Sequence, residues 1–416
     1  MIKNTLYLIL ILTITNSLCF SQTKQIRGLV LGKMDSLPLP YVNIYNDEYK
    51  FGTVSNELGE YLLSYPDSIS TFNLTFSYLG YLTEIKSNKS ITDSVYLTES
   101  NIKLDEVLIL NTNKDISYTL KKVFENIKIN YNNKRHLLKG FYREVAFKSI
   151  DSSYIRIVEA DIDIQEYGIL KALDRDRIQI NQFRKSDDKI TKKWYMDVAS
   201  SMFGNKSSLV WLKKRDFIKN FVKFKDYHSH YNNILDNFQF NFVEYIKSDN
   251  SLVGVYSYFD KDYLNANLKE DEKNLLYINM DDYAIIKVIY QAIIGPVNSY
   301  KNLGYSEYQY TKIGDYYYLN RAKSLSFLSG KGQEKELKEE NLFIYQVFSD
   351  RKQYDKIKRK DAIKINEDIY DSKVELDTLF WSNYKILSEI PLKQKLKTIL
   401  QKDRNLEDQF LDNGKN

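Results

Sequence analysis

Short apolar runs, each ended by glycine, proline or a polar turn, fill the first hundred residues of the chain. Their two-residue period predicts strands that pack as a small antiparallel β-sandwich. Val42 and Ile44 would face the core with Asn43 outward, and Gly59 follows Asn56 at turn spacing, where positive φ is favoured. The predicted strands are Arg27–Leu31, Tyr41–Ile44, Tyr61–Leu63, Phe72–Phe76 and Ser94–Leu97.

The period changes after Leu104–Leu110, which we interpret as a last strand or an exit segment. Ile116, Leu120, Val123 and Ile127 fall three or four residues apart, with charged residues between them. This spacing predicts an amphipathic helix over 115–130, capped by Asp115. We expect this helix to link two domains.

From Gly140 to about Val347 the pattern is mostly strand again, which predicts one large curved antiparallel sheet or half-barrel. Two apolar runs, Leu275–Asn279 and Ala284–Tyr290, flank Asp281-Asp282 and indicate a hairpin whose tip carries these acids. Helical insertions are expected near 192–203 and 212–219. The other predicted strands include 141–145, 154–164, 238–245, 253–259, 305–310, 316–326 and 342–347.

The last part of the chain, 351–416, changes to helical spacing. Phe380, Trp381, Leu387, Leu392 and Leu396 recur at roughly one helical face, which predicts a helical tail that packs on the large sheet.

The two strand-rich regions make the predicted fold class mainly β. The predicted divisions are a signal peptide at 1–21, a sandwich at 22–99, an exit strand and linker helix at 100–137, a large β domain at 138–350 and the tail at 351–416.

Residues 1–21 have the features of a secretory signal peptide: Lys3, an apolar run from Leu6 to Ile14 and a small-residue exit. We expect cleavage after Ser21. Cys19 is the only cysteine, and lipidation there is not expected because Leu18 occupies a position where lipoprotein signals carry a small residue. No later apolar run reaches membrane length, so the mature chain is expected to be exported to the periplasm, or peripheral to the outer membrane, without a transmembrane segment.

Charge and composition narrow the function classes. The 60 basic and 55 acidic residues are interspersed and leave a net charge of +5, which argues against a nucleic-acid surface. Cleavage would remove Cys19, so thiolate catalysis and sulfur-ligated metal are not expected. Tyrosine is abundant, at 35 residues, and we attribute this to codon bias rather than to a binding surface.

Neither the histidines nor a search for nucleophile motifs indicates a metal-binding or catalytic site. The three histidines are His136, His228 and His230, and none begins a zinc-binding helical motif. His228 and His230 could share one strand face as a metal pair, but an exposed loop or strand is the preferred interpretation. No nucleophile elbow, phosphate-binding loop or dinucleotide fingerprint is present. We therefore predict no catalytic residue, cofactor or metal.

Carboxylates in the strands were weighed as catalytic groups. Asp161 and Asp163 lie two apart and share a face, as would suit a glycosidase pair, while Ile162 and Ile164 take the other face. We expect that polar face to meet solvent.

Arg143-Glu144 and Glu159 are charged residues inside otherwise apolar strands. They could line a polar opening in the sheet. Pairing across neighbouring strands is the interpretation that we prefer.

A series of short motifs runs through the first domain in a specific order and spacing. They are Gly28-Leu29-Val30, Leu39-Pro40-Tyr41-Val42-Asn43-Ile44, Gly52-Thr53, Asn56, Gly59, Phe76-Ser77-Tyr78-Leu79-Gly80-Tyr81 and Leu104-Asp105-Glu106-Val107. Through these residues the first domain resembles the carboxypeptidase-regulatory-like, transthyretin-like domain found at the front of many Bacteroidetes envelope proteins. That domain also heads TonB-dependent outer-membrane receptors, whose barrel would not fit in this chain.

The remainder of the chain contains Phe141-Tyr142-Arg143-Glu144, Glu159-Ala160, Tyr277-Ile278 with Ala284-Ile285, and Phe380-Trp381 ending in Leu406-Glu407-Asp408-Gln409-Phe410. Through these residues it resembles the region that follows this domain in one group of those proteins, a group without an assigned activity. Our leading hypothesis is a non-enzymatic, exported cell-envelope protein that binds another envelope protein, or an apolar or extended ligand, or serves as a scaffold. One alternative is a periplasmic hydrolase acting on peptides or glycans through Glu159, Asp161, Asp163 or His228 and His230. Another is an accessory partner of a TonB-dependent transporter.

Overall fold

The computed structural model describes residues 23–56, 58–100, 116–148, 154–171, 175–189, 208–214, 216–221, 238–248, 251–260, 274–293, 303–331, 334–364, 367–383 and 404–414. The predicted signal peptide, the segment 104–110, the helix near 192–203 and the pair His228 and His230 lie outside these residues. In the described part of the chain, no helix is both long and apolar enough to cross a membrane.

The small domain is a sandwich of two sheets, with strand orders β4-β1-β7 and β3-β2-β5-β6. Its core is apolar, and Val42, Ile44, Leu74 and Phe76 are fully buried in it. Gly59 has φ +76° in the predicted turn, where the Asn56 side chain accepts hydrogen bonds from the backbone. Its strands are β1 (Thr23–Gly32), β2 (Asn43–Asn46), β3 (Phe51–Val54), β4 (Glu60–Pro66), β5 (Asn73–Ser77), β6 (Glu84–Ser87) and β7 (Ser94–Leu97).

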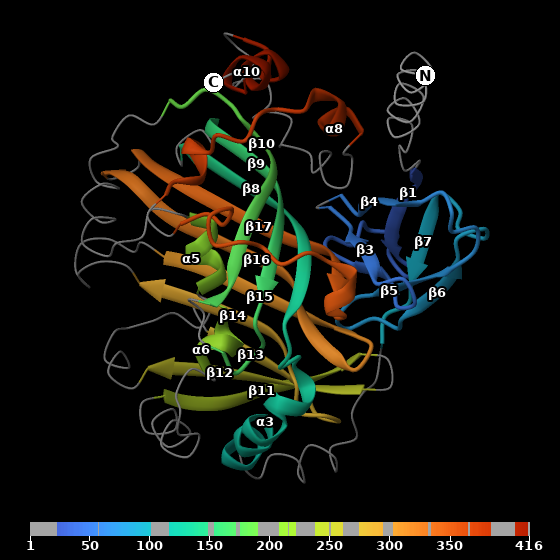
Figure 1. Cartoon of the computed structure of the whole chain (residues 1–416). Helices are drawn as coiled ribbons and strands as arrows, with labels where there is room; N and C mark the ends of the chain where they lie inside the picture. Colours follow the sequence, from blue (N-terminus) through green and yellow to red (C-terminus); the bar gives the residue numbers. More distant parts are fainter. Residues whose placement is uncertain are drawn as a thin grey trace, which may run out of the picture.

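The large domain is an antiparallel sheet with the strand order β11-β12-β13-β14-β15-β16-β17-β8-β9-β10, curled into a half-barrel (Figure 1). This confirms the predicted fold class. Its strands are β8 (His136–Lys148), β9 (Tyr154–Glu166), β10 (Arg177–Lys185), β11 (Phe238–Ser248), β12 (Ser251–Asp260), β13 (Asn274–Asn279), β14 (Ile285–Ile293), β15 (Leu303–Ile313), β16 (Tyr316–Lys331) and β17 (Glu334–Phe348).

Some strands of the large sheet were predicted correctly, whereas others were missed or began at a different residue. The hairpin of β13 and β14 around Asp281-Asp282 is confirmed. Strand β10 was missed although Ile178, Ile180 and Phe183 lie in it, because polar residues separate them. Strand β17 starts eight residues earlier than predicted, since its charged first half pairs with β16 on one side and β8 on the other.

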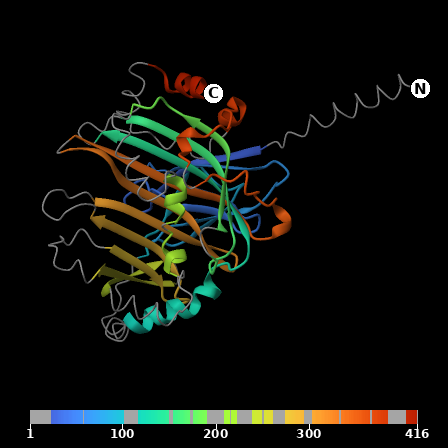
Figure 2. The same ribbon diagram turned by 60° about the vertical axis from the view of Figure 1, so that its left-hand side comes forward.

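Helices lie in the concave side and at both ends of the half-barrel. Instead of one helix near 212–219 there are two, α5 (Ser208–Lys214) and α6 (Phe217–Phe221), on the concave side. Helix α3 (Ile116–Asn130) lies at one end of the half-barrel, and α8 (Thr378–Asn383) and α10 (Leu406–Asn413) lie at the other (Figures 1 and 2).

The tail becomes helical later than expected. Between 351 and 377 the described chain contains only the 3-10 turns η3 (Arg351–Gln353) and η4 (Ile369–Asp371). Charged residues dominate this stretch, so hydrogen bonds to the sheet, rather than a helical apolar face, fix its course. The Ile363 amide, for example, donates to the carbonyl of Ile178 in β10.

The small domain continues the large sheet at β17. Gln346 of β17 pairs with Phe51 of β3, and the Val347 amide donates to the Lys50 carbonyl. Asn43, predicted to point outward, does leave the sandwich core, but its side chain accepts a hydrogen bond from Asn320 of β16. The outward face of β2 is therefore a contact with the half-barrel.

Candidate functional site

A cluster of buried ionisable side chains lies inside the half-barrel, and we call it the concave cluster. Glu166 ends β9, Asp176 precedes β10, His136 begins β8, and α5 and α6 supply the rest. Every member's side chain is at most 7% exposed. The members are His136, Glu166, Asp176, Lys213, Asp216 and Lys219.

Glu166 is the centre of the cluster. Its carboxylate oxygens lie 2.5 Å from Lys213 Nζ, 2.9 Å from Lys219 Nζ and 3.4 Å from His136 Nε2. Lys213 also lies 2.9 Å from Asp216, and Lys219 contacts Asp176. The two lysines thus bridge three carboxylates, which compensates for the loss of hydration of each ion.

Local structure explains how α5 and α6 bring their charges to one place. The Asp216 side chain accepts a hydrogen bond from the Ile218 amide, as a helix N-cap does, and so marks the break between the two helices. Its Oδ1 also accepts a hydrogen bond of 2.7 Å from the hydroxyl of Tyr310 in β15. The Tyr308 hydroxyl donates to the carbonyl of Leu212. The sheet therefore holds both helices through polar contacts.

Burial and neighbouring charges shift the pKa values of the side chains in the cluster. Burial alone would raise the pKa of Glu166, but Lys213 and Lys219 outweigh burial and hold the pKa well below its usual range. For Asp176 burial prevails over Lys219, and the nearby charge of Glu166 adds to it, so its pKa is raised. Burial and Asp216 raise the pKa of Tyr310 well above its ordinary value.

The space beside this cluster is small. A cavity of about 20 Å³ is lined by His136, Glu166, Asp216, Lys219 and neighbouring tyrosines. That volume accommodates about one water molecule. No three described His, Cys, Asp or Glu side chains form a metal-binding group. The arrangement of the described residues is suited to fixing α5 and α6 against the sheet.

Sequence reasoning missed the concave cluster, although one signal was available. Glu166 follows Ile162 and Ile164 at two-residue spacing, so it lies on the face of β9 that is buried in the main core. A glutamate on an apolar face needs a buried cation as its partner. The sequence does not indicate that Lys213 and Lys219, far along the chain, supply it.

A second group of ions lies on the other, convex face of β8, β9 and β10. Arg143 Nε donates to Glu159 Oε1 at 2.6 Å, and Arg184 Nε donates to Glu159 Oε2 at 2.5 Å. Burial would raise the pKa of Glu159, but the two guanidinium groups outweigh it and lower the pKa. The predicted pairing of Arg143 with Glu159 across neighbouring strands is confirmed.

The neighbouring Glu144 is paired too, on the concave face. Arg156 of β9 forms an ion pair with it, and the Tyr142 hydroxyl lies 3.2 Å from its Oε2 and 3.1 Å from Glu340 Oε1. Both Glu144 and Arg156 are buried. These contacts give Glu144 a structural role.

Asp161 and Asp163 share the convex face of β9, as predicted, but the expectation of solvent around them is wrong for Asp161, which is 5% exposed. Its carboxylate accepts hydrogen bonds from the Tyr345 hydroxyl at 2.7 Å and from Asn181. Asn181 also donates to Asp163. The reason is that the tail covers this face, which the alternation in β9 alone does not reveal.

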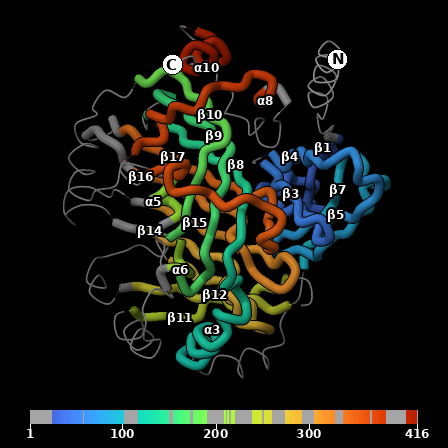
Figure 3. The backbone as a smooth tube through the Cα atoms, viewed as in Figure 1, coloured from blue at the N-terminus to red at the C-terminus, as the bar shows by residue number. Residues whose placement is uncertain are grey.

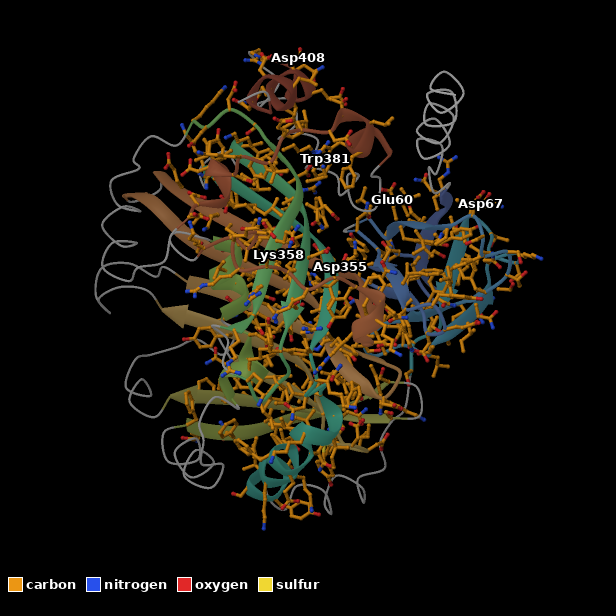
Figure 4. All side chains as sticks on the ribbon, viewed as in Figure 1. Glu60, Asp67, Asp355, Lys358, Trp381 and Asp408 are labelled. Carbon is orange, nitrogen blue, oxygen red and sulfur yellow. The ribbon has the colours of Figure 1, made fainter. Side chains whose placement is uncertain are left out.

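Aromatic side chains of the tail close over the convex ions. The Arg184 guanidinium lies 4.3 Å from the ring centre of Trp381 in α8 and 4.7 Å from that of Phe410 in α10. Figure 4 places Trp381 beside the sheet at α8. Phe380 and Trp381 were predicted to dock the tail on the large sheet, and Trp381 packs with Phe141 and Phe343.

The junction between the two domains is another buried contact. The Arg321 guanidinium lies 3.6 Å from the ring centre of Tyr41 and donates to Glu307 at 3.0 Å. Val54 of β3 packs with Phe343 of β17. The small domain is thus held on the convex side of the half-barrel by aromatic, ionic and backbone contacts together.

The small domain keeps three exposed apolar side chains on or next to β6 and β7, at Leu82, Ile85 and Tyr96, which we call the outer edge. The Leu82 amide donates to the Thr98 carbonyl just beyond β7, so the segment before β6 runs next to the end of β7. In the described chain β6 pairs with β5 alone. Figure 1 shows β6 and β7 facing away from the half-barrel.

A comparison with known families identifies the family that the small domain matches. Residues 26–109 match the family model of the CarboxypepD_reg-like domain. A relative, TonB-dependent receptor P3 of Formosa agariphila, is 33% identical over 110 residues, which is 26% of this chain and 11% of the receptor. The recognition of this domain from its sequence is confirmed. The chain spans only about a tenth of the length of the receptor.

Two solved structures align with more than half of the chain at low sequence identity. A LolA superfamily protein of Nitrosomonas europaea aligns over 59% of this chain and 97% of its own, with 10% identity and a TM-score of 0.25. Lipovitellin aligns over 57% of this chain and 27% of its own, with 8% identity and a TM-score of 0.24. Scores this low carry no argument about fold or function.

Proposed function

We propose that this chain is a non-enzymatic, exported cell-envelope protein in which the half-barrel is a scaffold and the small domain binds a partner protein. The observation that carries the proposal is the division of the small domain into two sides. One side is fixed to the half-barrel through Tyr41 and Asn43, while the outer edge displays Leu82, Ile85 and Tyr96. The match of residues 26–109 to a domain also found in a TonB-dependent receptor supports an envelope location.

The partner is an extended segment of another envelope protein that adds to β6. Exposed edge strands can gain backbone hydrogen bonds from an added strand, and flanking apolar side chains supply contact area. Strand β6 is four residues long and carries Ile85, which is 62% exposed. A short edge of this kind suits a reversible contact.

The ligand-binding and hydrolase alternatives receive less support. In the described part of the concave side, α5 and α6 pack against aromatic side chains of the sheet, and the cavity beside the concave cluster has a volume of only about 20 Å³. Glu159 is held between two arginines, and Asp161 accepts two hydrogen bonds. None of these carboxylates faces the cavity.

A more specific proposal is that the partner is a TonB-dependent transporter. The similarity of the small domain to part of such a receptor favours this choice. Affinity purification of the tagged chain from envelope extracts tests both levels. Recovery of a transporter supports the specific proposal, recovery of another envelope protein supports only the general one, and recovery of none above background contradicts both.

A further inference from the structure

The segment 351–364, which we call the basic strap, leaves β17 and runs to the free edge of β10. It contains seven basic and two acidic residues, an excess of five. The whole chain has a net charge of +5, so the rest of the molecule is balanced. The fourteen residues of the strap therefore carry an excess of positive charge as large as the net charge of the whole chain.

Hydrogen bonds fix the strap against the sheet. The buried Ile357 donates its amide to Gln165 Oε1 at 3.1 Å and accepts from the guanidinium of Arg177. Six residues later the Ile363 amide donates to β10 at 2.8 Å. Between these anchors the Asp361 amide donates to the Lys358 carbonyl and closes a turn with Arg359 and Lys360 at its tip. Figure 3 shows the strap crossing the strands, and Figure 4 labels Asp355 and Lys358 on it.

Most of the strap's cations have no ion-pair partner among the described residues. In the strap Lys364 pairs with Glu367. Six further cations are exposed and form no ion pair with a described acidic residue; they are Arg351, Lys352, Lys356, Lys358, Arg359 and Lys360.

We propose that the basic strap binds an anionic membrane surface through the phosphates of lipid headgroups. The cations lie on an exposed, anchored turn rather than around a pocket, so they can meet a flat surface of charge together. Clusters of four to eight Lys or Arg residues gain about 1 kcal/mol per residue near such a surface. This inference takes the envelope location from the proposed function. It does not require that the outer edge binds a partner protein, because the strap and the outer edge are separate surfaces.

The test is co-sedimentation of the chain from residue 22 with two kinds of vesicle, phosphatidylcholine alone and phosphatidylcholine mixed with phosphatidylglycerol. We expect binding only to the mixed vesicles, and weaker binding at higher salt because salt screens exposed charge. The variant K358Q/R359Q/K360Q should bind about 100-fold more weakly, at roughly fivefold per charge removed. Its thermal midpoint should not change, since these side chains are exposed.

The matched control is K89Q/K121Q/K128Q, which removes three exposed charges elsewhere and should bind like the unmodified chain. Equal binding to both kinds of vesicle, or an equal loss in the control variant, would overturn the proposal. Binding to duplex DNA but to neither vesicle would also overturn it, in favour of nucleic acid. If vesicle binding fails while the outer edge still captures a partner protein, this inference alone is wrong.

Discussion

The two cores of this protein are built differently. The core of the small domain is apolar, from Val30 to Leu97, and the buried polar side chains among its described residues, such as Ser55 and Asn56, are uncharged. Its strands alternate between buried and more exposed positions. In the half-barrel, β8 and β9 are buried on both faces and carry ions on each: Arg143 and Glu159 on the convex side, Glu166 on the concave side. The hydrophobic pattern therefore specifies the small domain, whereas the half-barrel also needs charges that are matched over long sequence distances.

The largest effect is expected from breaking the concave cluster. Glu166→Ala would leave Lys213 and Lys219 buried without their shared carboxylate, at a cost of about 3–5 kcal/mol in the free energy of unfolding. Chemical denaturation followed by fluorescence measures this change. Glu125→Gln, in an exposed ion pair on α3, is the control and should leave the free energy of unfolding almost unchanged, because solvent screens the pair. A small cost for Glu166→Ala would show that the cluster does not stabilise the half-barrel.

A comparable loss of stability is expected in the small domain when apolar packing alone is removed. Leu74→Ala would remove a fully buried side chain of its core and cost about 2–5 kcal/mol, depending on how far the site collapses. Hydrogen exchange resolved by segment should show the loss in β2 and β5. Leu58→Ala, at a position 50% exposed, should change stability by no more than about 0.5 kcal/mol. Equal effects of the two substitutions would contradict the packing described.

The smallest expected effect is on the pH dependence of stability, which should change when a buried charge of the half-barrel is removed but not when an apolar side chain of the small domain is truncated. The pKa of Glu159 is lowered in the folded state, so its contribution to stability is present above its unfolded pKa of about 4.5 and is lost as pH falls through the folded pKa. Denaturation midpoints from neutral pH downward should therefore fall more steeply for the unmodified chain than for Glu159→Gln. The slope of Leu74→Ala should match that of the unmodified chain, because no charge is altered. Parallel slopes for the chain and Glu159→Gln would be the opposing result.

Sequence reasoning reached the fold but not the placement of the charges. The sandwich, the linker helix and the large antiparallel sheet follow from local period and turn residues, as Asn56 and Gly59 illustrate. The expected Arg143–Glu159 pair followed from charges in apolar strands. The burial of Asp161 did not, because it depends on Tyr345 of β17, 184 residues further along the chain.

The concave cluster shows the same limit more strongly. The spacing of Ile162, Ile164 and Glu166 places the carboxylate inside, yet only the packing of α5 and α6 shows which lysines neutralise it. Strand β10 was missed because its apolar positions are separated by polar residues that the tail covers. Such features depend on tertiary contacts, whose partners a single sequence does not specify.

The central claim is that the outer edge of the small domain, and not the half-barrel, contacts the partner. A photoreactive amino acid placed at position 85 or at position 129 in living cells tests this directly, because Ile85 and Ile129 are both exposed but lie on different domains. We predict a cross-linked envelope protein from position 85, lost when Leu82 and Tyr96 are also replaced by lysine, and none from position 129. Cross-linking from position 129 alone, or equally from both positions, would contradict the account.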